Sequence, residues 1–226
     1  MAVDGNKGRS SSKGGGIQRR NRGGRQAKTA YDRLLKSALD VLLEGGYSRF
    51  RIAETAKRAG VSRGIQFYHF SKKLDLIEAA IEAEFESEVD VHRKTASETA
   101  QGNIIRAAAE QFEAFLAGKL FRACSNLVIS VKEPKSLVDK VKAISTKSRD
   151  PIASAWIERL VDAGADPETA RDAFWLLWNV QRGLSAQKHI GGDPGGDDDI
   201  LDYAVGLTND YVRQRSPAFD GGDRPN

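Results

Sequence analysis

Apolar residues recur every three or four positions along most of the chain, which is the spacing that places them on one face of an α-helix. Helices are predicted over residues 29–44, 72–95, 103–116, 121–131, 134–160, 168–189 and 198–213. Pro151 is expected to kink or interrupt the fifth of these. No stretch alternates apolar and polar residues as a half-buried strand does. The sequence therefore predicts an all-α protein.

The first predicted helix has a continuous apolar stripe and defined ends. The stripe consists of Tyr31, Leu34, Leu35, Ala38, Leu39 and Leu42. Thr29 is expected to begin the helix, with Asp32 completing a weak capping box, and Gly45-Gly46 is expected to end it. Tyr47 and Phe50 then close the core of a small three-helix domain.

Residues 51–73 predict two short helices joined by a tight turn. The apolar side of the first is formed by Ile52, Ala56 and Ala59. Gly60 is expected to end this helix, because glycine readily takes the left-handed conformation found at helix C-termini. Val61 would lie between the helices, and the Ser62 hydroxyl would cap the second one. This is a helix-turn-helix, which places its second helix in the DNA major groove.

These residues resemble the TetR family of one-component bacterial transcriptional regulators. The matching motifs are Ala59-Gly60-Val61-Ser62, Arg63-Gly64, Phe67-Tyr68-His69-Phe70 and Lys73 through Leu76. The resemblance reaches back to about Ala30, so it covers roughly fifty residues, and beyond Ala80 it rests on helix layout alone. It implies an N-terminal DNA-binding domain, an effector pocket inside a C-terminal helical domain, and dimerisation through the last two helices.

The residues expected at the DNA interface combine base readers with phosphate contacts. They are Arg51, Ser62, Arg63, Gly64, Gln66, Phe67, Tyr68, His69 and Lys73. Arginine pairs with guanine and glutamine with adenine, so Arg63 and Gln66 are the candidate base readers. Gln66 has a second interpretation as a polar core residue, since that position is buried in many relatives.

The remaining interface residues are expected to act on the DNA backbone. Tyr68, His69 and Lys73 would hold phosphates, with Arg51 and the N-terminus of its helix on the flank. Phe67 stands where relatives commonly have a tyrosine that touches phosphate, so Tyr68 is expected to take over that contact.

Charge is unevenly divided along the chain. Residues 1–28 carry a net charge of +7, residues 29–73 carry +5, and residues 74–226 carry −8. The basic part coincides with the DNA-binding segment, as expected of a protein that binds a polyanion. Residues 1–27 are predicted to be a disordered arm that is either a solvated tail or an additional phosphate contact, and residues 216–226 a flexible tail.

The second domain, residues 74–215 after a DNA-binding domain at 28–73, is predicted to hold the effector and the dimer interface. Five aromatic residues either line a pocket or fill the core: Phe112, Phe115, Trp156, Trp175 and Trp178. The helix at 168–189 is apolar on two sides and needs two burial partners. The dimer interface is assigned to Leu177, Leu184, Leu201, Val205 and Thr208.

The sequence gives little support for a catalytic site or a metal site. The three histidines are scattered, and no cluster of ligands has the spacing of a metal site, so no metal or cofactor is expected. The acidic loop with Asp193, Asp197, Asp198 and Asp199 lacks EF-hand spacing. The single Cys124 excludes an intrachain disulfide and fits a reducing cytoplasm. No apolar run approaches the roughly 18 residues that span a bilayer, so no membrane partner is expected.

The expected function is therefore that of a homodimeric transcriptional repressor, not an enzyme. A small lipophilic or aromatic effector would release it from a palindromic operator. One alternative is an activator, or a regulator of the same fold controlled by a protein partner. Another is a helical enzyme or lipid carrier joined to a helix-turn-helix, which a turnover assay would reveal.

Overall fold

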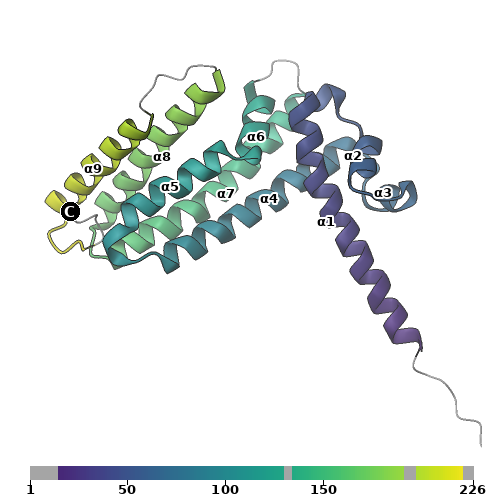
Figure 1. Ribbon diagram of the computed structural model, residues 1–226, viewed down its shortest axis with the longest axis horizontal. Coiled ribbons are helices and arrows are strands. Elements are labelled where there is room, and N and C mark those ends of the chain that lie inside the picture. The colour runs from purple at the N-terminus through teal and green to yellow at the C-terminus, as the bar shows by residue number, and fades with distance from the viewer. Residues whose placement is uncertain (1–14, 130–133, 191–196, 221–226) are drawn as a thin grey trace, which may run out of the picture.

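The computed structural model describes residues 15–129, 134–190 and 197–220, and every regular element within them is a helix (Figure 1). In chain order these are α1 (Gly15–Arg49), α2 (Ile52–Arg58), α3 (Arg63–His69), α4 (Lys73–Glu98), the 3-10 turn η1 (Gln101–Asn103), α5 (Ile104–Ala117), α6 (Lys119–Ile129), α7 (Lys135–Asp162), α8 (Pro167–Ile190) and α9 (Asp197–Arg215). The predicted all-α fold class is confirmed. None of the described helices is both long and apolar enough to cross a membrane.

The three N-terminal helices form the predicted small domain. Gly46 leaves the helical conformation with φ 63°, so α1 breaks where the two glycines were expected to end it. Gly60 has φ +61°, and the Val61 N–H donates to Ala56 O over 2.9 Å, which closes the C-terminus of α2. Phe50 is fully buried at the centre of the domain. The turn chemistry read from the sequence thus sets the angle between α2 and α3.

The start of α1 differs from the prediction. The helix begins at Gly15 rather than Thr29, so the backbone of residues 15–27 is helical and not a disordered arm. Adding turns to a helix already held by tertiary packing costs little, because the unfavourable step of helix formation is nucleation. The extension runs away from the rest of the molecule (Figure 1). Residues 1–14 lie outside the described chain.

The second domain is a bundle of long helices that starts with α4. This helix contacts α1 at its beginning and lies along α7, while α8 packs between α5 and α9. Figure 1 places α2 and α3 at one end of the molecule and α8 and α9 at the other. α7 continues through Pro151 as one helix, so the proline does not interrupt it. α4 is consequently the shared element of the two domains.

The segment after α9 is packed rather than flexible as far as residue 220. Phe219 is buried, and the Asp220 N–H donates to Ala163 O over 3.0 Å. Gly164 makes room for this segment, since a Cβ at that position would lie 2.4 Å from Ala218 O. The predicted flexible tail is therefore wrong for residues 216–220, because one aromatic anchor fixes them to the end of α7.

Candidate DNA interface and effector cavity

The outer face of α3 is exposed although two of its side chains are large and aromatic. Phe67 is 54% exposed and Tyr68 81% exposed. Ser62 caps the helix, since its Oγ accepts a hydrogen bond from the Ile65 N–H at 3.4 Å, as the capping prediction requires. Gly64 is exposed and has no heavy atom within 4 Å of the position of a Cβ. A partner surface can therefore approach α3 closely at its first turn.

Arg63 is the basic residue of this face. Its guanidinium lies over the Phe67 ring at 5.5 Å and makes no hydrogen bond or ion pair with any described residue. The stacking restricts the side chain while its donors stay free, which suits a base contact. Of the two candidate base readers, Arg63 is the one whose exposed position allows contact with a base.

Gln66 is buried, as its second interpretation as a polar core residue expects. It is 3% exposed, and its Nε2 donates to Phe70 O over 3.0 Å at the end of α3. A side chain held in this way supports the turn between α3 and α4. It lies on the opposite face from the exposed residues and is not placed to reach a base.

His69 lies partly buried at the end of α3. Its ring is 5.4 Å from the Tyr31 ring of α1 and 5.0 Å from the ring of Tyr68. Its Nε2 is buried without a hydrogen-bond partner in the described residues. The ring thus fills the contact between α3 and α1, whereas Tyr68 beside it is exposed.

Arg51 and Lys73 are both tied to the turn that follows α1. Arg51 donates through Nη1 to Ser48 O at 2.8 Å and to Phe50 O at 3.0 Å. The Lys73 ammonium donates to Tyr47 O over 3.1 Å and lies 3.6 Å from the centre of the Tyr47 ring. Both cations therefore have partners inside the domain, and Arg51 is also exposed. Lys72, one residue before Lys73, is exposed.

An ion-pair network fixes α2 against α1. Arg58 donates two hydrogen bonds of 2.6 Å to the Glu44 carboxylate and one of 3.1 Å to Glu54. The hydrogen bonds from Arg58 lower the pKa of Glu44, and those two carboxylates raise the pKa of Arg58. Because the groups are exposed, the network orients α2 more than it stabilises the fold.

The predicted aromatic residues are divided between core and cavity. Phe112 and Trp156 are fully buried, and the Trp156 indole N–H donates to His92 Nδ1 at 3.0 Å. Burial lowers the pKa of His92 to about 4, so the imidazole is neutral at pH 7. Trp175 lies partly exposed under the Arg149 guanidinium, 5.4 Å from the ring centre. None of these three aromatic residues lines the aromatic cavity beside them.

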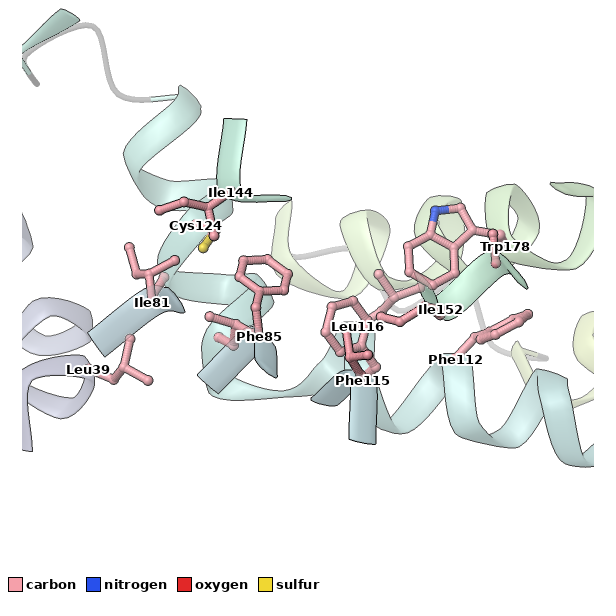
Figure 2. Close-up of a cluster of buried hydrophobic side chains, with 14 of the residues drawn as sticks. Leu39, Ile81, Phe85, Phe112, Phe115, Leu116, Cys124, Ile144, Ile152 and Trp178 are labelled. Carbon is pink, nitrogen blue, oxygen red and sulfur yellow. The ribbon is translucent and has the colours of Figure 1, made fainter. Parts of the chain in front are cut away.

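Phe115 and Trp178 line a cavity of about 390 Å³. Figure 2 shows side chains of α4 to α8, among them Phe85, Phe115 and Trp178, gathered in one cluster. The other lining residues are Phe121, Cys124, Ser125, Val128, Lys142, Ser145, Thr146, Arg149, Ile152 and Arg182. A volume near the lower end of the ~300–1,000 Å³ range of ligand pockets suits a small molecule.

The polar half of this cavity was missed in the sequence. Lys142, Ser145, Thr146 and Arg149 are spaced at i, i+3, i+4 and i+7, so they share one face of α7. That periodicity was visible, but a polar stripe beside an apolar one is also what a solvated helix face looks like. A hollow of about 620 Å³ between α4 and α7 is larger, yet both acids and bases line it and no aromatic side chain does.

The residues assigned to the dimer interface are buried inside the single chain. Leu177, Leu184, Leu201, Val205 and Thr208 are each at most 9% exposed. They hold α8 and α9 to each other and to α5. The apolar residues that α8 and α9 leave exposed are instead Leu176, Ile200, Tyr203 and Leu207. Helix periodicity located the stripe of α9 but not which of its two apolar faces is covered.

Within the part of the chain that is described, no three potential ligands come together to hold a metal ion. Asp193, Asp197 and Asp198 of the acidic loop lie outside the residues whose side chains are described, as does His189.

Comparisons with known proteins agree with this architecture. Residues 34–80 match the family model "Bacterial regulatory proteins, tetR family". The HTH-type transcriptional regulator CymR of Pseudomonas putida is 30% identical over 163 residues, which are 72% of this chain and 80% of that protein. The HTH-type transcriptional activator FasR of Mycolicibacterium smegmatis is 34% identical over 103 residues, 45% of this chain and 46% of that protein.

A solved structure shares the fold. It is a protein from Mesorhizobium loti MAFF303099 assigned to the TetR-family regulators, with a TM-score of 0.67 and 12% identity, and the match covers 84% of this chain and 98% of that one. The helix-turn-helix geometry, the family model and a relative matched over 80% of its length define a DNA-binding transcriptional regulator. The chain belongs to the TetR family.

Proposed function

We propose that the chain is a homodimeric repressor that a small apolar or aromatic effector releases from a palindromic operator. The observation that carries the proposal is the double role of α6. Phe121, Cys124, Ser125 and Val128 of α6 line the cavity, and the same helix packs against α1. Because α1 supports α3, a ligand that shifts α6 changes the position of the recognition helix.

Two ion pairs give this connection a defined geometry. The Lys119 ammonium at the start of α6 lies 2.6 Å from an Asp40 carboxylate oxygen of α1. Lys140 of α7 pairs with Glu78 of α4. α4 and α6 therefore both tie the DNA-binding domain to the walls of the cavity. A change in either helix alters the spacing of two recognition helices, which must match the DNA repeat.

The dimer is proposed to form through the exposed apolar face of α8 and α9. Ile200, Tyr203 and Leu207 recur at i, i+3 and i+7 on α9, and Leu176 adds to them from α8. Two copies packed on this face form a four-helix interface at the end of the molecule away from α3. The proposal includes no catalytic role, and a regulator that binds DNA in this way would act in the cytoplasm.

The test is a titration of a fluorescent operator fragment with the protein, with and without compounds that bind the protein. An effector is expected to weaken operator binding at least about tenfold, as typical coupling energies allow. A ligand that enters the cavity and leaves operator affinity unchanged would contradict the proposal. A ligand that strengthens operator binding would show that the protein needs its ligand to bind DNA, as a ligand-dependent repressor or an activator does.

A further inference from the structure

The charged side chains that line the cavity between α4, α5, α6, α7 and α8 are all positive. Lys142 and Arg149 reach it from α7 and Arg182 from α8, and no carboxylate is among its lining residues. Burial raises the pKa of the Cys124 thiol to about 12, so this thiol adds no negative charge to the cavity at pH 7. The cavity thus combines aromatic walls with three positive charges.

Two of these cations have no partner in the described part of the chain. Lys142 and Arg182 are exposed and form neither a hydrogen bond nor an ion pair there. By contrast, Lys119 and Lys140, which lie outside the cavity, are each paired with a carboxylate. Lys142 and Arg182 are therefore available to a ligand.

Arg149 adds a buried donor. Its guanidinium is positioned by the Trp175 ring and by Asp150, whose Oδ1 accepts from Nη2 at 3.3 Å. Its Nε is buried and has no acceptor among the described residues. Unpaired buried donors are rare in folded proteins, because they lose their hydrogen bonds to water without replacement. A ligand oxygen would supply the missing acceptor.

We propose that the effector is a small amphipathic carboxylate. Its apolar body, a ring or a short chain, lies against Phe85, Phe115 and Trp178, and its carboxylate faces Lys142, Arg149 and Arg182. Arginine and carboxylate match in charge and in planar geometry, and the three hydroxyl groups of the wall can complete the hydrogen bonding. This assignment of ligand class rests on the proposed function of the cavity as effector site.

The test compares carboxylic acids with their neutral amides of the same shape. The probes are 4-tert-butylbenzoate, cyclohexanecarboxylate and decanoate, each beside its primary amide, and binding is followed by calorimetry and by tryptophan fluorescence, to which the cavity residue Trp178 contributes. At least one acid is expected to bind about tenfold or more tightly than its amide, since hydrogen bonds to charged groups are the stronger ones. Equal affinity of acid and amide, or no binding of any acid, overturns the proposal.

Charge variants locate the contact. Lys142→Gln and Arg149→Gln are each expected to weaken acid binding about tenfold and to leave amide binding unchanged. Lys147→Gln is the matched control, because Lys147 is an exposed cation of α7 that does not line this cavity. Unchanged acid affinity in both cavity variants would show that these cations are merely solvated, and the proposal would fall.

Operator binding separates the two claims. If the operator is released by a neutral compound and by no acid, the proposed function stands and the ligand class is wrong. If an acid binds in a way that depends on Arg149 without any change in operator affinity, the ligand class stands and the proposed function is wrong.

Discussion

Trp156 of α7 donates its indole N–H to Nδ1 of His92 on α4 over 3.0 Å, and both side chains are fully buried. Because Nδ1 accepts, the neutral imidazole carries its proton on Nε2. Protonating Nδ1 would break this bond and place a charge in an aromatic core. Burial accordingly lowers the pKa of His92 to about 4.

The stability of the fold is therefore expected to depend on pH through His92. Below about pH 6.5 the unfolded chain takes up a proton at this residue that the folded chain does not. The free energy of unfolding falls as the pH drops, by on the order of 3 kcal/mol once the pH reaches about 4. Urea titrations at several pH values measure this loss. His92→Gln keeps an acceptor for Trp156 but cannot titrate, so it should lose less stability over the same window. Parallel curves for both proteins would contradict the assignment.

Gln66 is expected to affect folding rather than base choice. Replacing it with Leu removes the hydrogen bond to Phe70 O and leaves that carbonyl without its side-chain donor. The expected cost is roughly 1–3 kcal/mol of unfolding free energy. The base preference at each operator position should stay the same. A stable variant with altered preference at one position would instead make Gln66 a base reader.

Arg63 is expected to provide specificity. Arg63→Ala should cost roughly 1–3 kcal/mol on the cognate operator and much less on random DNA. Lys57→Ala is the matched control, because Lys57 is an exposed cation on α2 rather than α3. Anisotropy titrations on both DNAs give the comparison. An equal loss of affinity on the two DNAs would identify Arg63 as a phosphate contact.

The elements that local chemistry determines could be predicted from the sequence. Gly60 and Ser62 act through backbone conformation and capping, which depend on a few neighbouring residues, and the structure places both as expected. The partners of long side chains could not be predicted. Lys73 was expected on phosphate but bonds to Tyr47, 26 residues away in the sequence, which no local pattern encodes.

Helix α9 shows the same limit for packing. Leu201 and Val205 form an apolar stripe, and so do Ile200, Tyr203 and Leu207, half a turn away. Which stripe is covered by α8 depends on the tertiary arrangement. For the cavity, Phe115 and Phe112 lie three residues apart, yet one lines it and the other is core.

The exposed apolar stripe of α9 is the proposed dimer interface. Tyr203→Glu combined with Leu207→Glu should yield a folded monomer in sedimentation, because these side chains are 70% and 49% exposed in the single chain. Tight operator binding should be lost with the dimer, while weak non-specific binding remains. Val91→Glu, at an exposed apolar position of α4, should leave the dimer intact. A double variant that is folded, dimeric and fully active would place the interface elsewhere.

The most direct test of the central claim is a selection of bound fragments from genomic DNA with the purified protein, followed by an affinity titration on the recovered sequence. A dimeric TetR-family regulator that reads DNA through α3 should enrich a motif with twofold symmetry and bind it at least about 10³-fold more tightly than random DNA at physiological salt. Recovery of unrelated fragments, all bound with the same salt-sensitive affinity, would contradict the account.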